Sequence, residues 1–342
     1  MNKHIYVLHE YGAPSHYNAL VSLANKHGYN ITMGVFTIRG ILAAFYRGRY
    51  KSAFISIYTM LTLPFKHDQK VVLGIAPFSK YLPWLCKALR NQELYYHTSF
   101  TSWDGSNMAQ PTKSEHLKKR WERFTNNVSQ IFAVSNKTKE ELITHGYSDG
   151  TNISVVNHSY SSIIKATPKY KDNSFIYVGR LVKCKGISEL LEIFARHSEA
   201  TLTIAGSGDL EDIVKSYAER YTNINYIGFI NGLNNLIPIY SSHSFLIMNS
   251  KRVGSWEELF GISIIESMAC GCVPITTDHP GPKEIIIDNQ SGFISKEGEI
   301  ELSINKAIEL SDSMYQELRA AAIATGEEYQ SDKIASRWRA IL

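Results

Sequence analysis

The feature that most constrains the fold of this chain is a regular alternation of short apolar runs with longer amphipathic segments. In the first half, apolar runs such as residues 5–8 and 71–75 alternate with segments such as residues 15–27. The alternation restarts at residues 175–178 and continues to residues 273–276. Strands that alternate with helices are typical of a parallel sheet with helices on both faces. The sequence therefore predicts an α/β fold built from doubly wound, Rossmann-like domains.

The length of the chain and one polar interruption predict two such domains. With 342 residues the chain exceeds the usual size of a single hydrophobic core. The alternation lapses after Asn157, and the polar residues 167–173 read as an interdomain linker. We predict an N-terminal domain over residues 1–165, a C-terminal domain over 166–325, and a C-terminal helix over 326–342 that packs back on the N-terminal domain. In tandem doubly wound domains, ligands bind at the carboxyl ends of the strands, which predicts a site in an interdomain cleft.

Charge is distributed unevenly between the two halves. Residues 1–165 contain 19 Lys and Arg against 9 Asp and Glu, a balance of +10, whereas residues 166–342 contain 17 against 23, a balance of −6. A basic first half favours an anionic partner, which would be a membrane surface, an acidic substrate or nucleic acid. A solvated basic face explains the same composition equally well.

The cysteines and the apolar segments bound the compartment. Four cysteines at irregular spacing suit neither a disulfide framework nor a zinc site, and they fit a reducing cytosol. The first residues run directly into an apolar strand, which predicts no signal peptide. The most apolar window, residues 53–65, is shorter than the ~20 residues that a spanning helix needs. We expect a cytoplasmic protein that does not cross a membrane. The cysteines are Cys86, Cys184, Cys270 and Cys272.

Residues 45–58 combine basic and aromatic side chains just ahead of that apolar window. Arg47, Arg49 and Lys51 are interleaved with phenylalanine and tyrosine. This combination suits a helix that lies in a membrane interface, with its cations at the lipid head groups. A helix partly buried in the first domain explains it as well. An anionic membrane surface is therefore one candidate partner, at the inner face of the plasma membrane.

A basic loop follows the first strand of the second half. The segment from Gly179 to Gly186 places Arg180 and Lys185 between a strand and a helix, where free backbone amides and the helix dipole favour an anion. Arginine holds phosphate oxygens in a fork, and lysine adds a point charge. The pattern indicates a phosphate or diphosphate site. Two basic residues beside a surface helix are also common without any ligand.

Two weaker signals come next along the chain. Gly206 lies in a Gly-Ser-Gly loop between a strand and a helix, and glycine there allows close backbone approach to a ligand. This loop lacks the third glycine and the acidic residue of a dinucleotide-binding fingerprint. Ile230 ends an Ile-Gly-Phe-Ile run whose backbone groups would line a nucleobase pocket or simply end a strand.

Two carboxylates, Glu258 and Glu266, stand eight residues apart across a Phe260-Gly261 turn that opens an apolar helix. Three interpretations are open. The two residues act as a general acid and base, or they accept hydrogen bonds from sugar hydroxyls, or one is a charge at the start of a helix and the other is a solvated surface residue. At a helix N-terminus the dipole favours the ionised form of Glu258, which suits a hydrogen-bond acceptor more than a proton donor. The pattern favours hydroxyl recognition.

His97 is placed at the carboxyl end of a predicted strand in the first half, facing the predicted cleft. The chain has 12 histidines, and a lone histidine is more often structural than functional. Its position at a strand end gives the functional interpretation equal weight.

The order of these motifs is more specific than any one of them. Gly-Arg, Lys-Gly, Gly-Ser-Gly, Ile-Gly-Phe and the glutamate pair before Met-Ala-Cys-Gly-Cys-Val-Pro follow one another between residues 174 and 295. Over this region the sequence closely resembles the family-4 retaining glycosyltransferases of the GT-B fold, also called glycosyl transferases group 1. The first half resembles the family only weakly.

The resemblance implies a donor site and an activity. In the family, the residues that match Arg180 and Lys185 bind a nucleotide diphosphate, the match of Glu266 holds the ribose hydroxyls, and that of Glu258 contacts the donor sugar. Backbone amides of Phe260, Gly261 and Ile262 would face the sugar and phosphate. The match of His97 lies near the donor sugar. The catalytic set is then Glu258, His97, Arg180 and Lys185, and the family needs no metal or other cofactor.

Two departures from the family concern the first half. The usual Gly-Gly loop after the first strand is replaced by Glu10-Tyr-Gly12-Ala-Pro, so Gly12 alone represents the acceptor loop. The usual Pro-Asn-Gly turn before the linker is Val156-Asn157-His158 here. These changes affect the acceptor more than the diphosphate.

The sequence thus predicts a glycosyltransferase with an N-terminal acceptor-binding domain and a C-terminal donor-binding domain. The donor would be a nucleotide diphosphate sugar, with a UDP-sugar favoured, and the acceptor a glycan or lipid-linked glycan of a bacterial surface polysaccharide. Nucleic acid is not an expected partner. The alternatives are a nucleotide-sugar epimerase of the same fold and a non-catalytic protein that binds nucleotide sugars or glycans. A Rossmann oxidoreductase is disfavoured because the dinucleotide fingerprint is incomplete.

Overall fold

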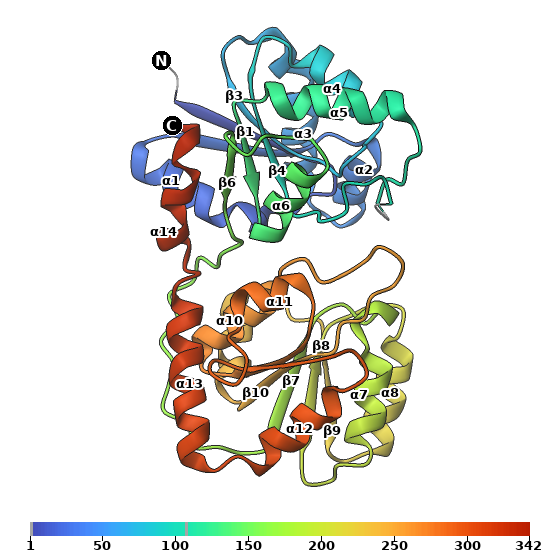
Figure 1. Ribbon diagram of the computed structural model, residues 1–342, viewed down its shortest axis with the longest axis vertical. Coiled ribbons are helices and arrows are strands. Elements are labelled where there is room, and N and C mark those ends of the chain that lie inside the picture. Colours follow the sequence, from blue (N-terminus) through green and yellow to red (C-terminus); the bar gives the residue numbers. More distant parts are fainter. Residues whose placement is uncertain (1–2, 107–108) are drawn as a thin grey trace. The chain divides into compact units, whose positions relative to one another are not determined.

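The structure is a computed structural model that describes residues 3–106 and 109–342 (Figure 1). It contains two compact units, one formed by the described residues up to 161 together with 331–342, and the other by residues 162–330. We call them the first and second domains. The chain leaves the first domain after Ser161 and returns to it at Ser331. The polar residues 167–173 belong to the second domain.

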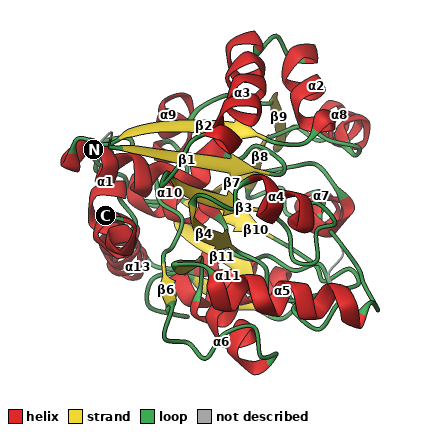
Figure 2. Ribbon diagram, turned by 90° about the horizontal axis from the view of Figure 1, so that it is seen from above, coloured by secondary structure: helices red, strands yellow, loops and turns green. Residues whose placement is uncertain are grey.

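The first domain is built on a parallel sheet of six strands in the order β2-β1-β3-β4-β5-β6 (Figure 2). On the central strand β3, Val71, Val72 and Leu73 are all fully buried. Continuous burial along a strand requires cover on both faces, as the apolar runs of the sequence predict. The strands are β1 (His4–His9), β2 (Asn30–Val35), β3 (Lys70–Gly74), β4 (Glu93–Thr98), β5 (Gln130–Ala133) and β6 (Ile153–Val155).

The helices of the first domain include a break that the sequence analysis did not foresee. Residues 45–58 do not form one helix, because α2 ends at Tyr46 and α3 begins at Tyr50. Gly48 adopts a left-handed φ of 69°, a conformation that terminates helices and that glycine adopts without strain. The helices are α1 (Asn18–His27), α2 (Ile38–Tyr46), α3 (Tyr50–Thr62), α4 (Leu82–Ala88), α5 (Glu115–Asn127), α6 (Asn136–Thr144) and α14 (Ser331–Ile334).

The second domain repeats the architecture with a sheet in the order β12-β11-β10-β7-β8-β9. Its strands are β7 (Ser174–Val178), β8 (Thr201–Ala205), β9 (Ile224–Gly228), β10 (Phe245–Met248), β11 (Val273–Thr277) and β12 (Phe293–Ser295). Its helices are α7 (Ile187–Phe194), α8 (Glu211–Arg220), α9 (Leu233–Ser241), α10 (Ile262–Cys270), α11 (Pro280–Ile285), α12 (Ile300–Glu309) and α13 (Asp312–Glu327). Every helix in the described part of the chain is too short or too polar to span a membrane.

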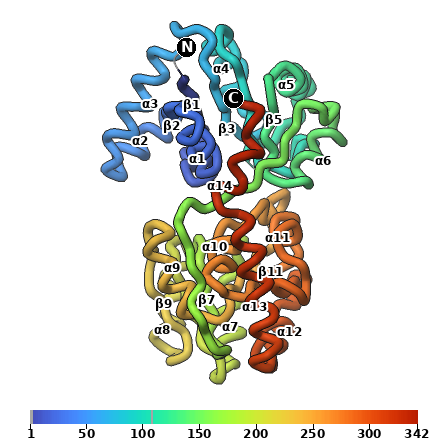
Figure 3. Tube along the Cα trace, turned by 90° about the vertical axis from the view of Figure 1, so that its left-hand side faces the viewer, coloured from blue at the N-terminus to red at the C-terminus, as the bar shows by residue number. Residues whose placement is uncertain are grey.

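The C-terminal residues complete the core of the first domain. α14 lies beside α1 in Figures 1 and 3, and a 3-10 helix, Ala335–Ile341, follows it. In that 3-10 helix Trp338 is buried, with its ring centroid 4.3 Å from Phe132 on β5 and 5.3 Å from His97 on β4. The end of the chain therefore covers strands that precede it by about two hundred residues.

Replacing Trp338 tests this role of the C-terminus. Trp338→Ala should lower the free energy of unfolding of the first domain by about 3–5 kcal/mol, because it removes a buried ring and leaves a cavity. Urea unfolding followed by far-UV circular dichroism measures the loss. The matched control is Trp84→Ala on α4, because the Trp84 side chain is 48% exposed. Equal losses in the two variants would contradict the assignment.

Candidate functional site

The strand order of the second domain determines the position of the candidate ligand site. The chain progresses outward from β7 through β8 and β9, and then returns to add β10 on the other side of β7. The loops that follow β7 and β10 therefore diverge at the carboxyl end of the sheet. In doubly wound sheets the crevice at this switch point is the ligand site. Residues 179–186 and 249–261 form the two loops.

Glycines bring the backbones of neighbouring loops into contact. A Cβ atom on Gly206 would lie 1.9 Å from the carbonyl oxygen of Gly179, so only glycine fits there. The amide of Gly206 donates to the carbonyl of Gly228 at 2.9 Å. Gly186 has a left-handed φ of 63°, and its Cβ would lie 2.0 Å from the carbonyl oxygen of Asn249. Contact between loops thus accounts for Gly206, and its contact with a donor stays a prediction.

Lys185 and Glu258, predicted from separate motifs, form an ion pair at this switch point. The ammonium of Lys185 contacts the carboxylate of Glu258, and each side chain is only 12% exposed. The hydroxyl of Ser250, just after β10, donates to the same carboxylate at 3.1 Å. The Lys185 ammonium also lies 5.1 Å from the ring centroid of Trp256, a cation–π distance. The loops after β7 and β10 therefore meet through a charged contact.

His279 is a candidate that the sequence analysis missed. It is fully buried directly after β11, and its Nδ1 accepts a hydrogen bond from the amide of Glu258 at 3.0 Å. Its Nε2 lies 2.8 Å from the carbonyl oxygen of Ser250, to which it donates. This pattern requires a neutral ring with its proton on Nε2. Burial lowers the pKa of His279, which favours the same neutral form.

His279 therefore ties the backbone of Glu258 to that of Ser250. We assign it as a positioning residue, because its ring bonds the two backbone segments that carry the ion pair; its Nε2 also lies 3.4 Å from the carboxylate of Glu297. Its one sequence signal is its place at the carboxyl end of a strand, the edge of a parallel sheet where functional residues gather.

Glu266 lies on the second turn of α10, where it is half-buried. The hydroxyl of Tyr240 on α9 donates to its carboxylate at 3.4 Å, a long hydrogen bond. Burial raises the pKa of Glu266 to about 7, and the Tyr240 bond offsets only part of that effect. At neutral pH this carboxyl group is only partly ionised. Hydrogen bonds from ligand hydroxyls would stabilise its charged form and lower its pKa.

The remaining residues predicted to bind the donor lie in loops of the second domain or beside Glu258. Arg180 is exposed, and its carbonyl accepts from the hydroxyl of Tyr177 at 2.7 Å. Gly261, with a left-handed φ of 95°, opens α10. Phe260 is buried, Ile262 begins α10, and Ile230 is half-buried after β9. The contacts of these five residues with a donor stay predictions.

In the first domain, a cavity of about 130 Å³ after β1 is lined by residues that include Gly12, Arg47 and Arg49. Gly12 has a left-handed φ of 71°. Its amide donates to Nδ1 of His9 at 3.0 Å, as does the amide of Tyr11. Burial lowers the pKa of His9 to about 3, so the ring stays a neutral acceptor that holds this loop.

His97 is placed differently from the expectation that it faces an open cleft. Its side chain is only 4% exposed, and its ring centroid lies 4.9 Å from Tyr17 and 5.9 Å from His158, in addition to the Trp338 contact. Burial lowers its pKa well below the ordinary value. The ring is therefore neutral and enclosed by first-domain side chains. Its catalytic role stays a prediction that the packing does not favour.

The described residues contain no group of three or more histidine, cysteine, aspartate or glutamate side chains arranged to hold a metal ion. That the reaction needs no metal stays a prediction from the family resemblance.

Known proteins resemble this chain most clearly over the domain that carries the candidate site. Residues 161–329 match the family model for glycosyl transferases group 1, which covers almost the whole second domain. The capsular polysaccharide biosynthesis glycosyltransferase CapM of Staphylococcus aureus is 26% identical over 230 residues, 61% of this chain and 58% of CapM. An uncharacterized glycosyltransferase of Haemophilus influenzae is 26% identical over 183 residues, 51% of this chain and 50% of that protein. The chain spans about half the length of the curated relatives it matches.

A solved structure establishes the class of fold. The crystal structure of Anabaena Alr3699/HepE in complex with UDP and glucose is 17% identical, covers 98% of both chains and gives a TM-score of 0.72. The predicted GT-B fold, with two Rossmann-like α/β domains, is confirmed. The family match assigns the second domain of this chain to the glycosyl transferases group 1.

The raised pKa of Glu266 has a measurable consequence for stability. Its folded pKa, about 7, exceeds its ordinary value of 4.5, so the folded state binds more protons between these values. Stability should therefore fall as pH rises from about 4.5 to 7, by at most about 2–3 kcal/mol. Urea unfolding of the wild type and Glu266→Gln at several pH values measures it. Glutamine cannot ionise, so the variant should lack this loss, and identical pH profiles would contradict the assignment.

Proposed function

We propose that this protein is a retaining, metal-independent glycosyltransferase that moves a sugar from a nucleotide diphosphate donor to a glycan or lipid-linked glycan acceptor. A UDP-sugar is the favoured donor. The observation that carries the proposal is the Lys185–Glu258 pair at the switch point of a group 1 domain. UDP in the complex of the Anabaena protein supports the donor class.

The chemical reason concerns the leaving group. Departure of a nucleoside diphosphate builds negative charge on its oxygens, and preorganised positive groups lower the barrier by stabilising that charge. Arg180 and Lys185 supply two cations in the loop after β7, and the start of α10 supplies backbone amides. Donor binding would give Lys185 a second anion to contact beside Glu258.

Glu258 then serves the sugar. Its carboxylate keeps the hydrogen bond from Ser250 and its backbone keeps the bond to His279, so it stays in place when Lys185 contacts the diphosphate. An ionised carboxylate accepts hydrogen bonds from sugar hydroxyls, which suits recognition. Glu266 serves the ribose in the same way.

The anomeric configuration is retained if the bond to the diphosphate breaks and the bond to the acceptor forms on the same face of the donor sugar. The bond from the anomeric carbon to the diphosphate oxygen breaks, and the acceptor hydroxyl attacks the same face. The acceptor proton passes to the departing diphosphate, so charge and atoms balance without a separate acid. The pairing of Glu258 with a cation supports this route over an acid–base pair.

The pathway we propose is the synthesis of a bacterial surface polysaccharide, such as a capsule, O-antigen or lipopolysaccharide. The name of the related CapM protein, a capsular polysaccharide biosynthesis glycosyltransferase, supports this choice.

A panel of UDP-, GDP- and ADP-sugars tests the proposed activity. A true donor should stabilise the folded protein by mass action, by about 2.7 kcal/mol of unfolding free energy at one hundred times its Kd, and so raise the melting temperature. Incubation with that donor alone should give at most slow hydrolysis. Conversion to another sugar without acceptor would indicate an epimerase, and stabilisation without turnover on any acceptor would indicate a binding protein.

The two glutamates should separate binding from turnover. Glu266→Ala should weaken nucleotide binding by about tenfold to a hundredfold, the value of a lost charged hydrogen bond, with a smaller effect on kcat. Glu258→Ala should lower kcat by about a hundredfold or more with a smaller effect on nucleotide affinity. Calorimetry with the nucleoside diphosphate and steady-state kinetics measure the two effects. Glu219→Ala, at an exposed position on α8, is the control. The reverse pattern would refute the assigned roles.

A further inference from the structure

The α2–α3 hairpin, residues 38–65, exposes large apolar side chains along both of its helices. α2 has no buried residue, and its Ile38, Leu42 and Tyr46 recur every fourth position on one face. Tyr46 is 95% exposed and Phe65, just after α3, is 83% exposed. The hairpin holds 8 of the 20 large apolar residues that are exposed in the described chain, which exceeds the scatter expected of an ordinary surface.

α3 distributes its polar and apolar residues in the opposite way from an ordinary surface helix. The residues it buries against the sheet are small or polar, namely Ala53, Ser56 and Thr59. The hydroxyl of Ser56 accepts a hydrogen bond from the amide of Val35 at 3.0 Å, which covers the free edge of β2. A helix in a soluble protein normally turns its large apolar residues toward the core. Here Tyr50, Phe54, Tyr58 and Leu61 are turned outward instead.

The charge of the same surface has one sign. No aspartate or glutamate occurs between Glu10 and Asp68. Arg39, Arg47, Arg49 and Lys51 are exposed, and no ion-pair partner is found for them among the described residues. Figure 3 shows α2 and α3 side by side at the β2 edge of the first domain. Apolar side chains and unpaired cations therefore occupy one projecting element.

We infer that the α2–α3 hairpin docks the first domain on an anionic lipid bilayer. Its tyrosine, phenylalanine and leucine side chains would enter the interface between head groups and acyl chains, and its cations would contact lipid phosphates. A second copy of this chain is a poorer occupant, because pairing two such faces would bring like charges together. The inference stands on the hairpin itself and does not require the proposed transferase activity.

Docking through this face has a consequence for the adjoining cavity. Arg47 and Arg49, at the turn between α2 and α3, line the cavity of the Gly12 loop. The turn would carry the mouth of that cavity to the level of the lipid phosphates. A molecule that reaches the cavity from the bilayer would then be an amphiphile with an anionic head, which specifies the class of acceptor if the proposed function holds.

Vesicle flotation without any donor tests the docking. The wild type should float at low salt with vesicles that contain phosphatidylglycerol, and should float much less with pure phosphatidylcholine or at high salt. Arg47→Ser with Arg49→Ser should weaken binding about 25-fold, about fivefold for each cation. Tyr46→Ser with Leu61→Ser should weaken it at least tenfold through lost apolar burial.

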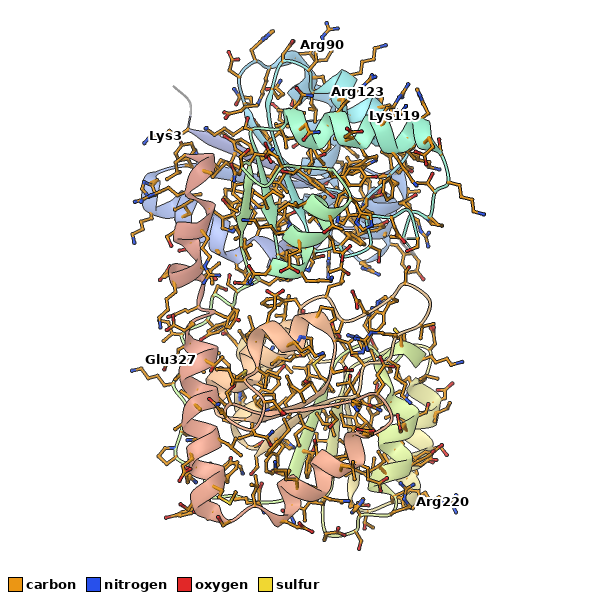
Figure 4. The ribbon with its side chains drawn as sticks, in the orientation of Figure 1. Lys3, Arg90, Lys119, Arg123, Arg220 and Glu327 are labelled. Atoms are coloured by element: carbon orange, nitrogen blue, oxygen red, sulfur yellow. The ribbon has the colours of Figure 1, made fainter. Side chains whose placement is uncertain are left out.

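Matched variants separate the hairpin from charge and exposure in general. Lys119→Ser with Arg123→Ser removes two cations of α5, whose side chains point outward from the same domain (Figure 4). Leu302→Ser with Met314→Ser removes exposed apolar residues of the second domain. Both control variants should float like the wild type.

Three results would overturn the inference. They are no flotation of the wild type, equal flotation of the hairpin and control variants, and a dimer in solution that only the hairpin variants dissociate. Circular dichroism confirms that each variant is folded. Donor-induced stabilisation, measured separately, should be unchanged in all hairpin variants. Its absence in the wild type would count against the proposed function and leave the docking result intact.

Discussion

The contact between Lys185 and Glu258 is the interaction on which the candidate site depends. Two charged side chains that are mostly removed from water are tolerated only when each finds a partner. The pair joins the loops after β7 and β10, and these loops meet only because β10 returns beside β7. Glycine at position 186 lets the loop after β7 approach the backbone of Asn249, just after β10, closely enough for that contact. Strand order, glycine placement and charge pairing are thus parts of one arrangement.

Two neutral histidines hold loops at the carboxyl edges of the two sheets in the same way. His279 accepts the amide of Glu258 in the second domain, and His9 accepts the amides of Tyr11 and Gly12 in the first. In both, Nδ1 must lack a proton, and burial lowers the pKa so that it does. A proton on Nδ1 of either ring would point at the N–H group that Nδ1 now accepts, and the hydrogen bond would be lost. Each loop shape therefore depends on an uncharged imidazole.

Most of the fold followed from the sequence pattern, because buried parallel strands appear in a sequence as continuous apolar runs. The predicted runs at residues 175–178 and 273–276 lie within β7 and β11. Two elements escaped notice for physical reasons. β12 has three residues, too few for any periodicity, and α11 begins Pro-Gly-Pro, a composition typical of turns. The positioning role of His279 depends on hydrogen bonds to distant backbone groups, and the enclosure of His97 depends on Trp338 near the end of the chain. Local sequence carries neither relation.

The return of the chain to the first domain at Ser331 makes that domain discontinuous in the sequence. A fragment that ends at residue 161 would lack the indole that covers Phe132 and His97, and a fragment that begins at residue 162 would carry that indole without its binding surface. No single cut of the chain yields two complete domains. Insertion or exchange of the second domain between relatives would therefore require two junctions, and a nascent chain could not finish its first domain until residues 331–342 had left the ribosome.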